Sequence, residues 1–451
     1  MFDTICAIST TLGVGAISII RLSGDKSIEI SNKIFKGKDL TKVDSHTINY
    51  GYIIDGTEII DEVLVSIMKA PKTYTKEDVV EINCHGGIST TNKILEILLL
   101  NGCRLAEPGE FTKRAFLNGR IDLIEAEAVG DLLNSETDKS RKLSINGLTG
   151  NITQMINEIR KKLVSISANI EVNIDYPEYE DAIVLTNTLI KPKIISIKDD
   201  LEKLLKESQD GKIIKNGIDV AIVGKPNVGK SSLLNTLLEE EKAIVTNVAG
   251  TTRDIVEGKI VLNGIVLNLV DTAGIRNTDD IVEQIGVNKS KEIIEKSNLV
   301  ILVLNNNEKI STEEIELINK LTNKNLIVYI NKNDLESKID LSKINCKNIV
   351  KGNTKNYKNL NELKSKIVEM FNLEKLENNN ANYLSNSRQI SIVKKAIMSL
   401  ENCLSEIDNN VEIDLLSIDI KECYDLLGEI IGETYKDELL DEIFANFCLG
   451  K

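Results

Sequence analysis

The sequence predicts a multidomain protein that combines an α+β domain, a helical domain and an α/β domain inserted into the helical one. Three observations support this fold class. Residues 1–118 hold short strand-like apolar runs, residues 121–215 show helical periodicity, and a glycine-rich loop between an apolar run and a helix begins at Gly224. Because helical periodicity returns after residue 387, the α/β stretch should interrupt a helical domain rather than follow it.

The length, charge and cysteine content of the chain restrict the kind of protein that it can be. At 451 residues it should hold about three domains. A net charge of −14 argues against a surface that coats nucleic acid generally, although it leaves room for a local basic patch. The seven cysteines are scattered without a Cys-x-x-Cys pair, which favours a reducing cytosol over a disulfide framework or a zinc site. With no leader pattern and no long apolar run, we expect a soluble, cytoplasmic protein without membrane association.

Residues 1–118 predict the N-terminal α+β domain. The expected strands cover residues 5–9, 16–22, 47–54, 58–69 and 79–84, and a helix is expected over 89–101. Cys84 and His85, followed by two glycines, have two interpretations. A strand end with a glycine turn is favoured over a Cys/His nucleophile, because no third group that would orient such a pair is evident.

Residues 119–215 predict the first part of the helical domain, and residues 376–451 predict the second. Apolar residues recur at steps of three and four from Ile152 to Ile170. Pro177 and Pro192 are expected to interrupt this pattern. The inserted α/β domain covers residues 216–375, and the polar residues 377–382 are expected to form the linker that returns to the helical domain.

The inserted domain begins with the phosphate loop Gly224-Lys225-Pro226-Asn227-Val228-Gly229-Lys230-Ser231. This loop matches Gly-x-x-x-x-Gly-Lys-Ser and lies between an apolar run at 220–223 and an expected helix at 232–238. Backbone N–H groups there can hold phosphates, Lys230 can reach the terminal phosphates, and the Ser231 hydroxyl can ligate Mg²⁺. The loop alone predicts a nucleoside triphosphate site without specifying the base.

Three later segments indicate that the nucleotide is GTP. Asp271-Thr272-Ala273-Gly274 offers a carboxylate for the metal shell and a glycine N–H for the γ-phosphate. Asn331-Lys332-Asn333-Asp334 offers a carboxylate that can accept from guanine N1–H and the 2-amino group, a pair that adenine lacks. Thr251-Thr252-Arg253-Asp254 lies where a switch loop would supply a second Mg²⁺ ligand. Together, in this order, the four segments predict a Ras-like GTPase domain.

The residue that usually orients the attacking water is missing from this pattern. Ras-like proteins place a Gln near the glycine of Asp-x-x-Gly, whereas Ile275 follows Gly274 here. Arg253 and Arg276 are candidate arginine fingers, although switch-loop arginines are as often solvated. Asn227 could ligate a monovalent cation beside the phosphates or simply form the turn, and the sequence alone favours neither.

Motifs outside the GTPase core resemble those of the MnmE (TrmE) family of tRNA-modification GTPases, over essentially the whole chain. They are Asp3-Thr4-Ile5 with Arg21-Leu22-Ser23-Gly24, the run Ala106-Glu107-Pro108-Gly109-Glu110 continuing to Arg120, and the terminal Phe447-Cys448-Leu449-Gly450-Lys451. A generic GTPase would have none of these three motifs, so the resemblance is specific.

The resemblance implies an N-terminal domain that forms a homodimer and binds a 5-formyl-tetrahydrofolate-type cofactor. Arg21, Glu81, Arg120 and Lys451 would line that pocket; without the resemblance, ordinary ion pairs would be the favoured interpretation of these residues. Cys448 resembles the family's C-terminal cysteine and is a candidate catalytic residue. Family members act with an FAD-dependent partner, MnmG (GidA), as a heterotetramer. They add an aminomethyl or carboxymethylaminomethyl group to C5 of the wobble uridine, position 34, of certain tRNAs.

The resemblance also implies that hydrolysis is activated by dimerisation of the G domains, with K⁺ in the place of an arginine finger. Glu283 would orient the attacking water. Asn227, Thr246, Val248 and Thr251 would hold K⁺, and Ser231 and Thr252 would hold Mg²⁺. The predicted GTP-binding residues are Asn227, Val228, Gly229, Lys230, Ser231, Ser232, Thr246, Asn247, Val248, Ala249, Gly250, Thr251, Thr252, Asp271, Thr272, Ala273, Gly274, Asn331, Lys332 and Asp334.

Two departures from the family pattern and two other function classes complete the prediction. Thr11-Leu12 stands where the family usually has Pro-Pro, and Asn353-Thr354-Lys355 replaces the usual Ser-Ala-Lys element that backs guanine. The backbone N–H of Thr354 could still face guanine O6.

A ribosome-assembly-type GTPase switch would call for a basic RNA-binding appendage, and a folate-dependent one-carbon transferase would leave the G domain as a regulatory module.

Overall fold

The structure is a computed structural model, and it describes residues 3–175, 187–240, 258–271, 292–354, 360–374, 383–384, 386–435, 437–445 and 447–451. The chain forms two compact units. The first comprises Met1–Leu133, Gly147–Asp200 and Ser391–Lys451, and the second comprises Asn134–Asn146 and Leu201–Ile390. The chain passes between the two units four times, after residues 133, 146, 200 and 390.

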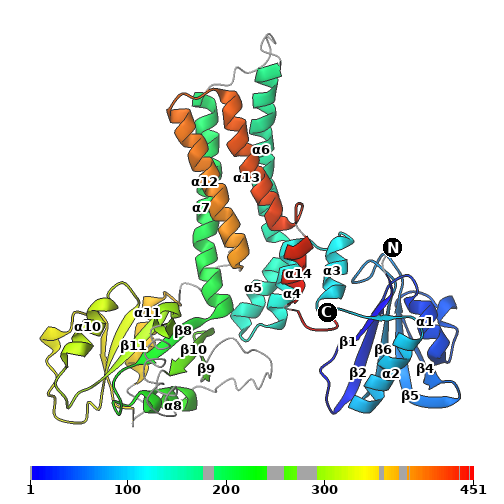
Figure 1. Cartoon of the computed structure of the whole chain (residues 1–451), viewed down its shortest axis with the longest axis horizontal. Helices are drawn as coiled ribbons and strands as arrows, with labels where there is room; N and C mark the ends of the chain where they lie inside the picture. Colours follow the sequence, from blue (N-terminus) through cyan, green and yellow to red (C-terminus); the bar gives the residue numbers. More distant parts are fainter. Residues whose placement is uncertain are drawn as a thin grey trace, which may run out of the picture. The chain divides into compact units, whose positions relative to one another are not determined.

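The N-terminal part of the first unit is built on a seven-stranded sheet with strand order β3-β4-β5-β6-β2-β1-β7 (Figure 1). Neighbouring strands pair antiparallel except β1 and β7, which are parallel. The elements are β1 (Ile5–Ile8), β2 (Gly15–Ser23), α1 (Ser27–Ile34), β3 (Phe35–Lys36), η1 (Leu40–Lys42), β4 (Thr47–Asp55), β5 (Glu58–Met68), β6 (Val79–Gly86), α2 (Ile88–Leu100) and β7 (Arg104–Leu105). The predicted strands and the predicted helix are all confirmed to within two residues at each end.

One face of this sheet carries the core, and the other is only partly covered: at β1, Ile5 and Ala7 pack with Ala106 and Phe111. Alternate residues of the strands pack with α1 and α2 into one apolar cluster, as the period of two in a strand requires. On the opposite face, several large apolar side chains are exposed; they include Ile17, Ile48, Tyr50 and Leu64. The sheet thus presents an uncovered apolar surface within the described residues.

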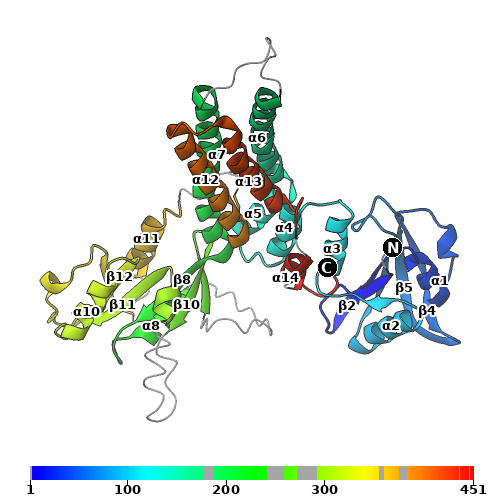
Figure 2. The same cartoon turned by 45° about the horizontal axis from the view of Figure 1, so that its top comes forward.

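The rest of the first unit is helical. Its elements are α3 (Glu110–Leu117), α4 (Leu123–Leu133), α6 (Asn151–Asp175), α7 (Asn187–Asn216), α12 (Ser387–Asp408), α13 (Ile413–Ile431) and α14 (Asp437–Ala445). Long helices lie side by side in pairs, α6 with α13 and α7 with α12 (Figure 2). Between α6 and α13, the buried Arg160 stacks on the Tyr424 ring at 4.2 Å and pairs with Glu433, which follows α13. Of these helices, α7 continues past Asp200 into the second unit.

The expectation that Pro192 interrupts the helical pattern is wrong. Pro192 lies inside α7 and is its sixth residue. A proline there lacks one N–H donor, so it costs one helical hydrogen bond. The buried stripe of Ile190, Ile194, Ile197 and Leu201 continues across it, and burial of these side chains outweighs the loss. Pro177 and the expected linker at 377–382 lie outside the described residues.

The second unit is an α/β fold around a six-stranded sheet with order β13-β12-β11-β8-β10-β9. Its strands are β8 (Ile218–Val223), β9 (Gly258–Leu262), β10 (Ile265–Asp271), β11 (Leu299–Asn305), β12 (Leu326–Asn331) and β13 (Ile349–Lys351). All pairs are parallel except the β9–β10 hairpin. One face packs with α8 (Lys230–Glu240) and α11 (Asn361–Met370), and the other packs with α10 (Thr312–Lys320). η2 (Leu341–Lys343) is a short 3₁₀ turn. Helices on both faces explain why β8, β11 and β12 read as continuous apolar runs.

Residues 134–146, which include most of one helix, belong to this second unit. The N-terminal portion of α5 (Asp138–Leu148) and the residues before it contact the β9–β10 hairpin. Lys259 pairs with Glu136 at 2.5 Å, the Lys139 side chain packs on the turn at Gly264, and Leu143 packs against the core of the unit. Residues 134–146, which we predicted as helical domain, therefore touch the G domain directly. The predicted domain limits otherwise stay a prediction.

Within the described residues, none of the helices is both long enough and apolar enough to cross a bilayer.

Candidate functional site

The phosphate loop lies between the carboxyl end of β8 and the start of α8, where ligands bind in open α/β sheets. Its shape depends on residues that tolerate left-handed backbone angles: φ is +148° at Gly224, +63° at Asn227 and +103° at Gly229. A Cβ at Gly224 would lie 2.4 Å from the Val303 carbonyl oxygen, and one at Gly229 would lie 2.2 Å from the Asn331 amide nitrogen. The two glycines are therefore required for the close approach of neighbouring strands, and the loop backbone can cradle phosphate oxygens.

Lys230 is folded over this loop. Its side chain is buried, and its ammonium donates to the carbonyl oxygens of Gly224 at 2.9 Å and Lys225 at 2.8 Å. Ser231 and Ser232 follow it in the first turn of α8, whose N–H groups point toward the loop. Because phosphate oxygens are stronger acceptors than these carbonyls, the ammonium is placed to exchange to them when a nucleotide enters.

The predicted guanine-binding segment is tied to the loop through Asn331. This side chain is almost fully buried, donates to the Val228 carbonyl at 2.9 Å, and accepts from the N–H groups of Lys332 at 2.8 Å and Thr354 at 3.1 Å. The Lys332 ammonium donates to the Asn227 carbonyl at 3.2 Å. The end of β12, followed by Lys332, therefore lies against the loop residues Asn227 and Val228.

Asp334 and Thr354 complete this side of the site. The Asp334 side chain is exposed, as a carboxylate that meets a base must be. Thr354 is fixed by Thr236, whose hydroxyl donates to the Thr354 carbonyl at 2.9 Å. In this structure the Thr354 N–H points to Asn331 and not outward to a base, so contact with guanine O6 requires that bond to exchange.

Much of the predicted catalytic apparatus lies outside the described residues. This holds for Thr246, Asn247, Val248, Ala249, Gly250, Thr251, Thr252, Thr272, Ala273, Gly274 and Glu283, and also for Arg253, Ile275 and Arg276. Asp271 ends β10 as predicted. The assignments of K⁺ to Thr246, Val248 and Thr251, of Mg²⁺ to Thr252 and of water orientation to Glu283 stay predictions.

A second group of predicted residues gathers in the first unit. Arg21 on β2 and Glu81 on β6 are opposite each other in the sheet, and the guanidinium reaches the carboxylate at 2.9 Å. The same guanidinium lies 5.7 Å from the Phe111 ring centre and donates to the Gly450 carbonyl at 3.3 Å. Burial, with the Arg21 charge as the second cause, lowers the pKa of Lys451. Because the Gly450 carbonyl bonds to Arg21, the adjacent Lys451 lies close to the Arg21–Glu81 pair.

Arg120 is placed beside this group through an apolar cluster. Its guanidinium stacks 4.8 Å from the Tyr74 ring centre. Tyr74 packs against the cluster that contains Phe111, the ring under Arg21. Arg120 is therefore linked to Arg21 indirectly, through two aromatic rings, and both guanidinium groups present donors that fit carboxylates.

Cys448 and the Cys84–His85 pair differ in what they can do. Cys448 is exposed, and its backbone carbonyl accepts from the Gly109 N–H at 3.4 Å. Cys84 is buried, and burial raises the pKa of its thiol. His85 points to the other face of β6, where both its backbone N–H and its Nδ1 contact the Asp61 carboxylate at 2.7 Å. The strand-end interpretation is therefore confirmed, and these two side chains cannot form a nucleophile–base pair.

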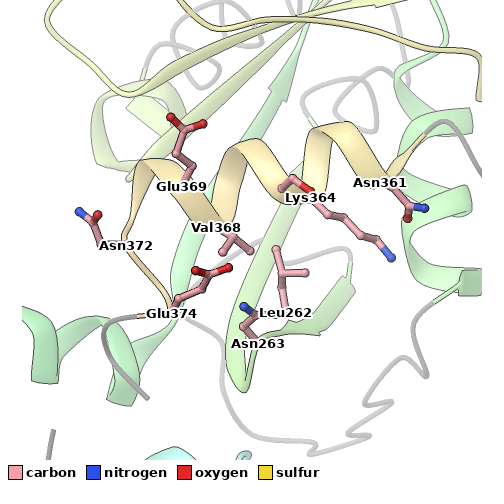
Figure 3. Close-up of a pocket in the computed structure, with 9 residues that line it drawn as sticks. Leu262, Asn263, Asn361, Lys364, Val368, Glu369, Asn372 and Glu374 are labelled. Atoms are coloured by element: carbon pink, nitrogen blue, oxygen red, sulfur yellow. The ribbon is translucent and has the colours of Figure 1, made fainter. Parts of the chain in front are cut away.

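Another cavity of the second unit holds none of the predicted residues. It has a volume of about 540 Å³ and lies between α11 and the β9–β10 turn (Figure 3). Lys364 and Glu369 of α11, together with Glu374, give it charges of both signs, and Asn263 of the turn adds a neutral amide. It offers no phosphate cradle of the kind seen at Gly224.

Sequence comparisons cover the whole chain. Residues 4–120 match the model of the GTP-binding protein TrmE N-terminus, and residues 123–448 match that of the MnmE helical domain. The chain is 48% identical over 456 residues to a protein of Bacillus cytotoxicus, with 100% of both chains covered. It is 50% identical over 450 residues to one of Lactococcus lactis, covering 100% of this chain and 99% of that one. A Bacillus subtilis protein is 46% identical over 458 residues, again with full coverage of both. All three are named tRNA modification GTPase MnmE.

Among solved structures, the G domain of the T. maritima FeoB iron transporter is similar at 29% identity, over 34% of this chain and 97% of that one, with a TM-score of 0.26. That score is too low to bear on the fold, so the assignment rests on the sequence matches. Since these span the N-terminal, helical and inserted regions at close to half identity, the chain belongs to the tRNA modification GTPase MnmE family.

Proposed function

We propose that this chain binds and hydrolyses GTP and that it uses this activity in tRNA modification. The observation that carries the proposal is the contact of Asn331 with the phosphate loop, which joins the phosphate-binding and base-binding segments into one site. Lys230 binds the terminal phosphates, and Asp334 selects guanine over adenine. Mg²⁺ bound by Ser231 and Thr252 would supply charge neutralisation at the phosphates.

For the modification itself, we propose that the chain acts with the FAD-dependent MnmG partner, in a heterotetramer, on C5 of the wobble uridine at position 34. The product is an aminomethyl or carboxymethylaminomethyl group. The site of Arg21, Glu81, Arg120 and Lys451 supports a folate of the 5-formyl-tetrahydrofolate type. Cationic donors there fit the glutamate carboxylates of a folate, and Glu81 can accept from the pterin N–H groups. The exposed Cys448 is the candidate reactive group of this site.

A nucleoside analysis of tRNA tests this function. In cells that lack this chain, mass spectrometry of tRNA should show wobble uridine without the C5 substituent, and the wild-type chain should restore it. Restoration should fail with Lys230→Ala, since that variant loses the phosphate contact. Intact C5 modification in the absence of the chain would rule out the proposed role.

We propose further that hydrolysis depends on K⁺ and on dimerisation of the G domains. Asn227 supports the K⁺ assignment, because its side chain is exposed at the loop while its backbone carbonyl is held by Lys332. Its amide oxygen can therefore ligate a cation beside the phosphates, together with Thr246, Val248 and Thr251. Glu283 would then orient the attacking water, the role that Ile275 cannot fill.

Replacing KCl with NaCl should lower kcat for GTP hydrolysis by roughly tenfold or more, because an arginine finger contributes about 10³–10⁵ in kcat and the cation would take over part of that role. The matched variant is Asn227→Gly, which keeps the +63° backbone angle but removes the amide. It should hydrolyse GTP at the same slow rate in both salts. Equal wild-type rates in KCl and NaCl would remove the K⁺ assignment.

The open face of the N-terminal sheet supports a homodimer. Ile17 is exposed on β2, which also carries Arg21. Ile48, Tyr50 and Leu64 expose apolar area on β4 and β5, and β5 pairs with β6, which carries Glu81. Contiguous exposed apolar surface beside a binding site is typical of a protein interface.

A further inference from the structure

The last five residues of the chain are docked on the end of β1. The Gly450 carbonyl accepts two hydrogen bonds, from the Ser9 hydroxyl at 3.0 Å and from the Arg21 guanidinium at 3.3 Å. Ser9 directly follows β1, and Arg21 lies on the neighbouring strand β2. These two bonds hold Gly450 against the N-terminal sheet.

Residue 450 can only be glycine in this docked arrangement. Its φ is +89°, an angle that residues with a Cβ rarely adopt. A Cβ there would lie 2.4 Å from the Ile8 carbonyl oxygen and 2.9 Å from Ser9 Cα. Ile8 is the last residue of the paired strand β1, and the Ser9 N–H is bonded to the Ile19 carbonyl, so neither backbone atom can move aside.

The start of the tail has its own anchor. The Phe447 ring lies 5.4 Å from the Phe444 ring centre and packs on Gly130 of α4, where a Cβ would come within 3.0 Å of it. The Cys448 carbonyl accepts from the N–H groups of Gly109 at 3.4 Å and Lys451 at 3.3 Å. The tail is therefore fixed at Phe447 and again at Gly450, and Cys448 lies between the two anchors.

Docking brings three functional candidates within electrostatic range. Lys451 is half-buried, and its pKa is lowered by burial and by the Arg21 charge and raised by Cys448. The bond from Arg21 to the Gly450 carbonyl and the bond from the Lys451 N–H to the Cys448 carbonyl place Arg21, Cys448 and Lys451 near one another. Arg21 itself is shared between Glu81 and the Gly450 carbonyl, so it cannot be regarded as a ligand-binding side chain alone.

We propose that Ser9 and Gly450 are positioning residues of the N-terminal site, which lock the C-terminal tail onto β1 and so place Cys448 and Lys451 beside the Arg21–Glu81 pair. The ligand of that site is the folate of the proposed function, and to this extent the inference rests on it. The lock itself consists only of contacts within the chain, so it can be tested separately.

Release of Lys451 by carboxypeptidase B from the full-length protein measures how firmly the tail is docked. Each rate is divided by the rate on a synthetic peptide with the same last five residues, which corrects for the enzyme's preference at position 450. Ser9→Ala should release Lys451 about three- to tenfold faster than wild type, the effect of one hydrogen bond. Gly450→Ala should accelerate release by more than tenfold, and Ser9→Thr, which keeps the hydroxyl, should return the rate toward wild type.

A matched control is Ser417→Ala, in which an exposed serine loses a local bond to the Asp414 carbonyl of α13. Its rate should equal that of wild type. The rate of Cys448 alkylation, followed by peptide mass spectrometry in a Cys346→Ser background, should change in Ser9→Ala and Gly450→Ala but not in Ser417→Ala. Unchanged release and alkylation in both tail variants would overturn the lock.

Binding of 5-formyl-tetrahydrofolate by calorimetry separates the lock from the function. If wild type binds the folate, Ser9→Ala should bind it several-fold more weakly, and Ser9→Thr should recover the affinity. If the tail variants release Lys451 faster but wild type binds no folate, the lock stands and the folate assignment fails. Ser9→Ala could also release Lys451 faster than wild type and yet bind the folate with equal affinity. In that case Ser9 holds the tail but positions no group for the ligand. This result would overturn the positioning role.

Discussion

Replacing Lys230 with alanine should lower kcat for GTP hydrolysis by about 100-fold or more, the usual cost of removing one preorganised charge from a phosphoryl-transfer site. In this structure the Lys230 ammonium bonds to the Gly224 and Lys225 carbonyls, within the loop that would receive the phosphates. No other described lysine side chain is both buried and held in this way against the loop's own backbone. Steady-state phosphate release in KCl and MgCl₂ measures the effect.

The matched control is Lys296→Ala. Lys296 lies in the same unit, is exposed and pairs with Glu292 one helical turn away. Exposed pairs of this kind contribute about 0.3–0.5 kcal/mol, so its kcat and melting temperature should stay close to wild type. If Lys230→Ala keeps more than half of the wild-type kcat at saturating GTP while Lys296→Ala behaves as expected, the phosphate loop is not the hydrolytic site.

The G domain was the most predictable part of the molecule. Each of its segments combines a strand-like apolar run with a short polar motif at the strand end, and these are local patterns. What the motifs could not show is how they touch. Asn331 was predicted to face the nucleotide, but its buried amide also joins the loop to Thr354, and this depends on β12 lying two strands from β8 in the sheet. Strand order is a non-local property that periodicity does not encode.

The N-terminal site was predictable only in part. The motifs that resemble the family marked Arg21, Glu81 and Lys451, and the structure places them together. Ser9 and Asp61 carried no signal, because each is one of many similar polar residues and acquires its partner only when the strands pair. The Pro192 error has a related cause. Proline has a strong local effect, but burial of an apolar stripe along α7 outweighs it.

The least predictable feature is a buried ion network around Arg114. This side chain is only 2% exposed and contacts three carboxylates, those of Asp3 at 2.9 Å, Glu77 at 3.1 Å and Glu110 at 2.9 Å. Its guanidinium also donates to the Asp3 carbonyl at 2.7 Å. Arg104 joins the network through Asp3 and Glu110. This ion network connects the first described residues, the loop before β6 and helix α3 to one another. It therefore holds α3 and the 106–120 run against the sheet.

Replacing Arg114 with methionine should destabilise this region by about 3–5 kcal/mol, because it leaves the buried Glu77 carboxylate without its cation and Glu110 with Arg104 alone, while keeping most of the side-chain volume. The amides of Arg104 and Ala106 report the effect, since they donate to the Thr4 and Cys6 carbonyls in the β1–β7 pair. Their hydrogen-exchange protection in the full-length protein should fall by about 100-fold or more. The control is Arg141→Met, which breaks an exposed pair with Asp138 and should leave protection unchanged.

The pH dependence gives this prediction a second check. The hydrogen bond from Arg104 is the largest cause that lowers the pKa of Asp3. Burial alone would raise the pKa of Glu110. Hydrogen bonds from Arg104, the Glu107 N–H and Arg114 outweigh this effect and lower that pKa. Carboxyls with lowered pKa stabilise the fold above their ordinary values of 3.8 and 4.5 and lose that contribution as pH falls below them. The difference in protection between wild type and Arg114→Met should therefore be largest near neutral pH and should shrink only as the pH falls below these ordinary values of 3.8 and 4.5. A difference that is independent of pH would mean that Arg114 stabilises this region by packing and not by its charge.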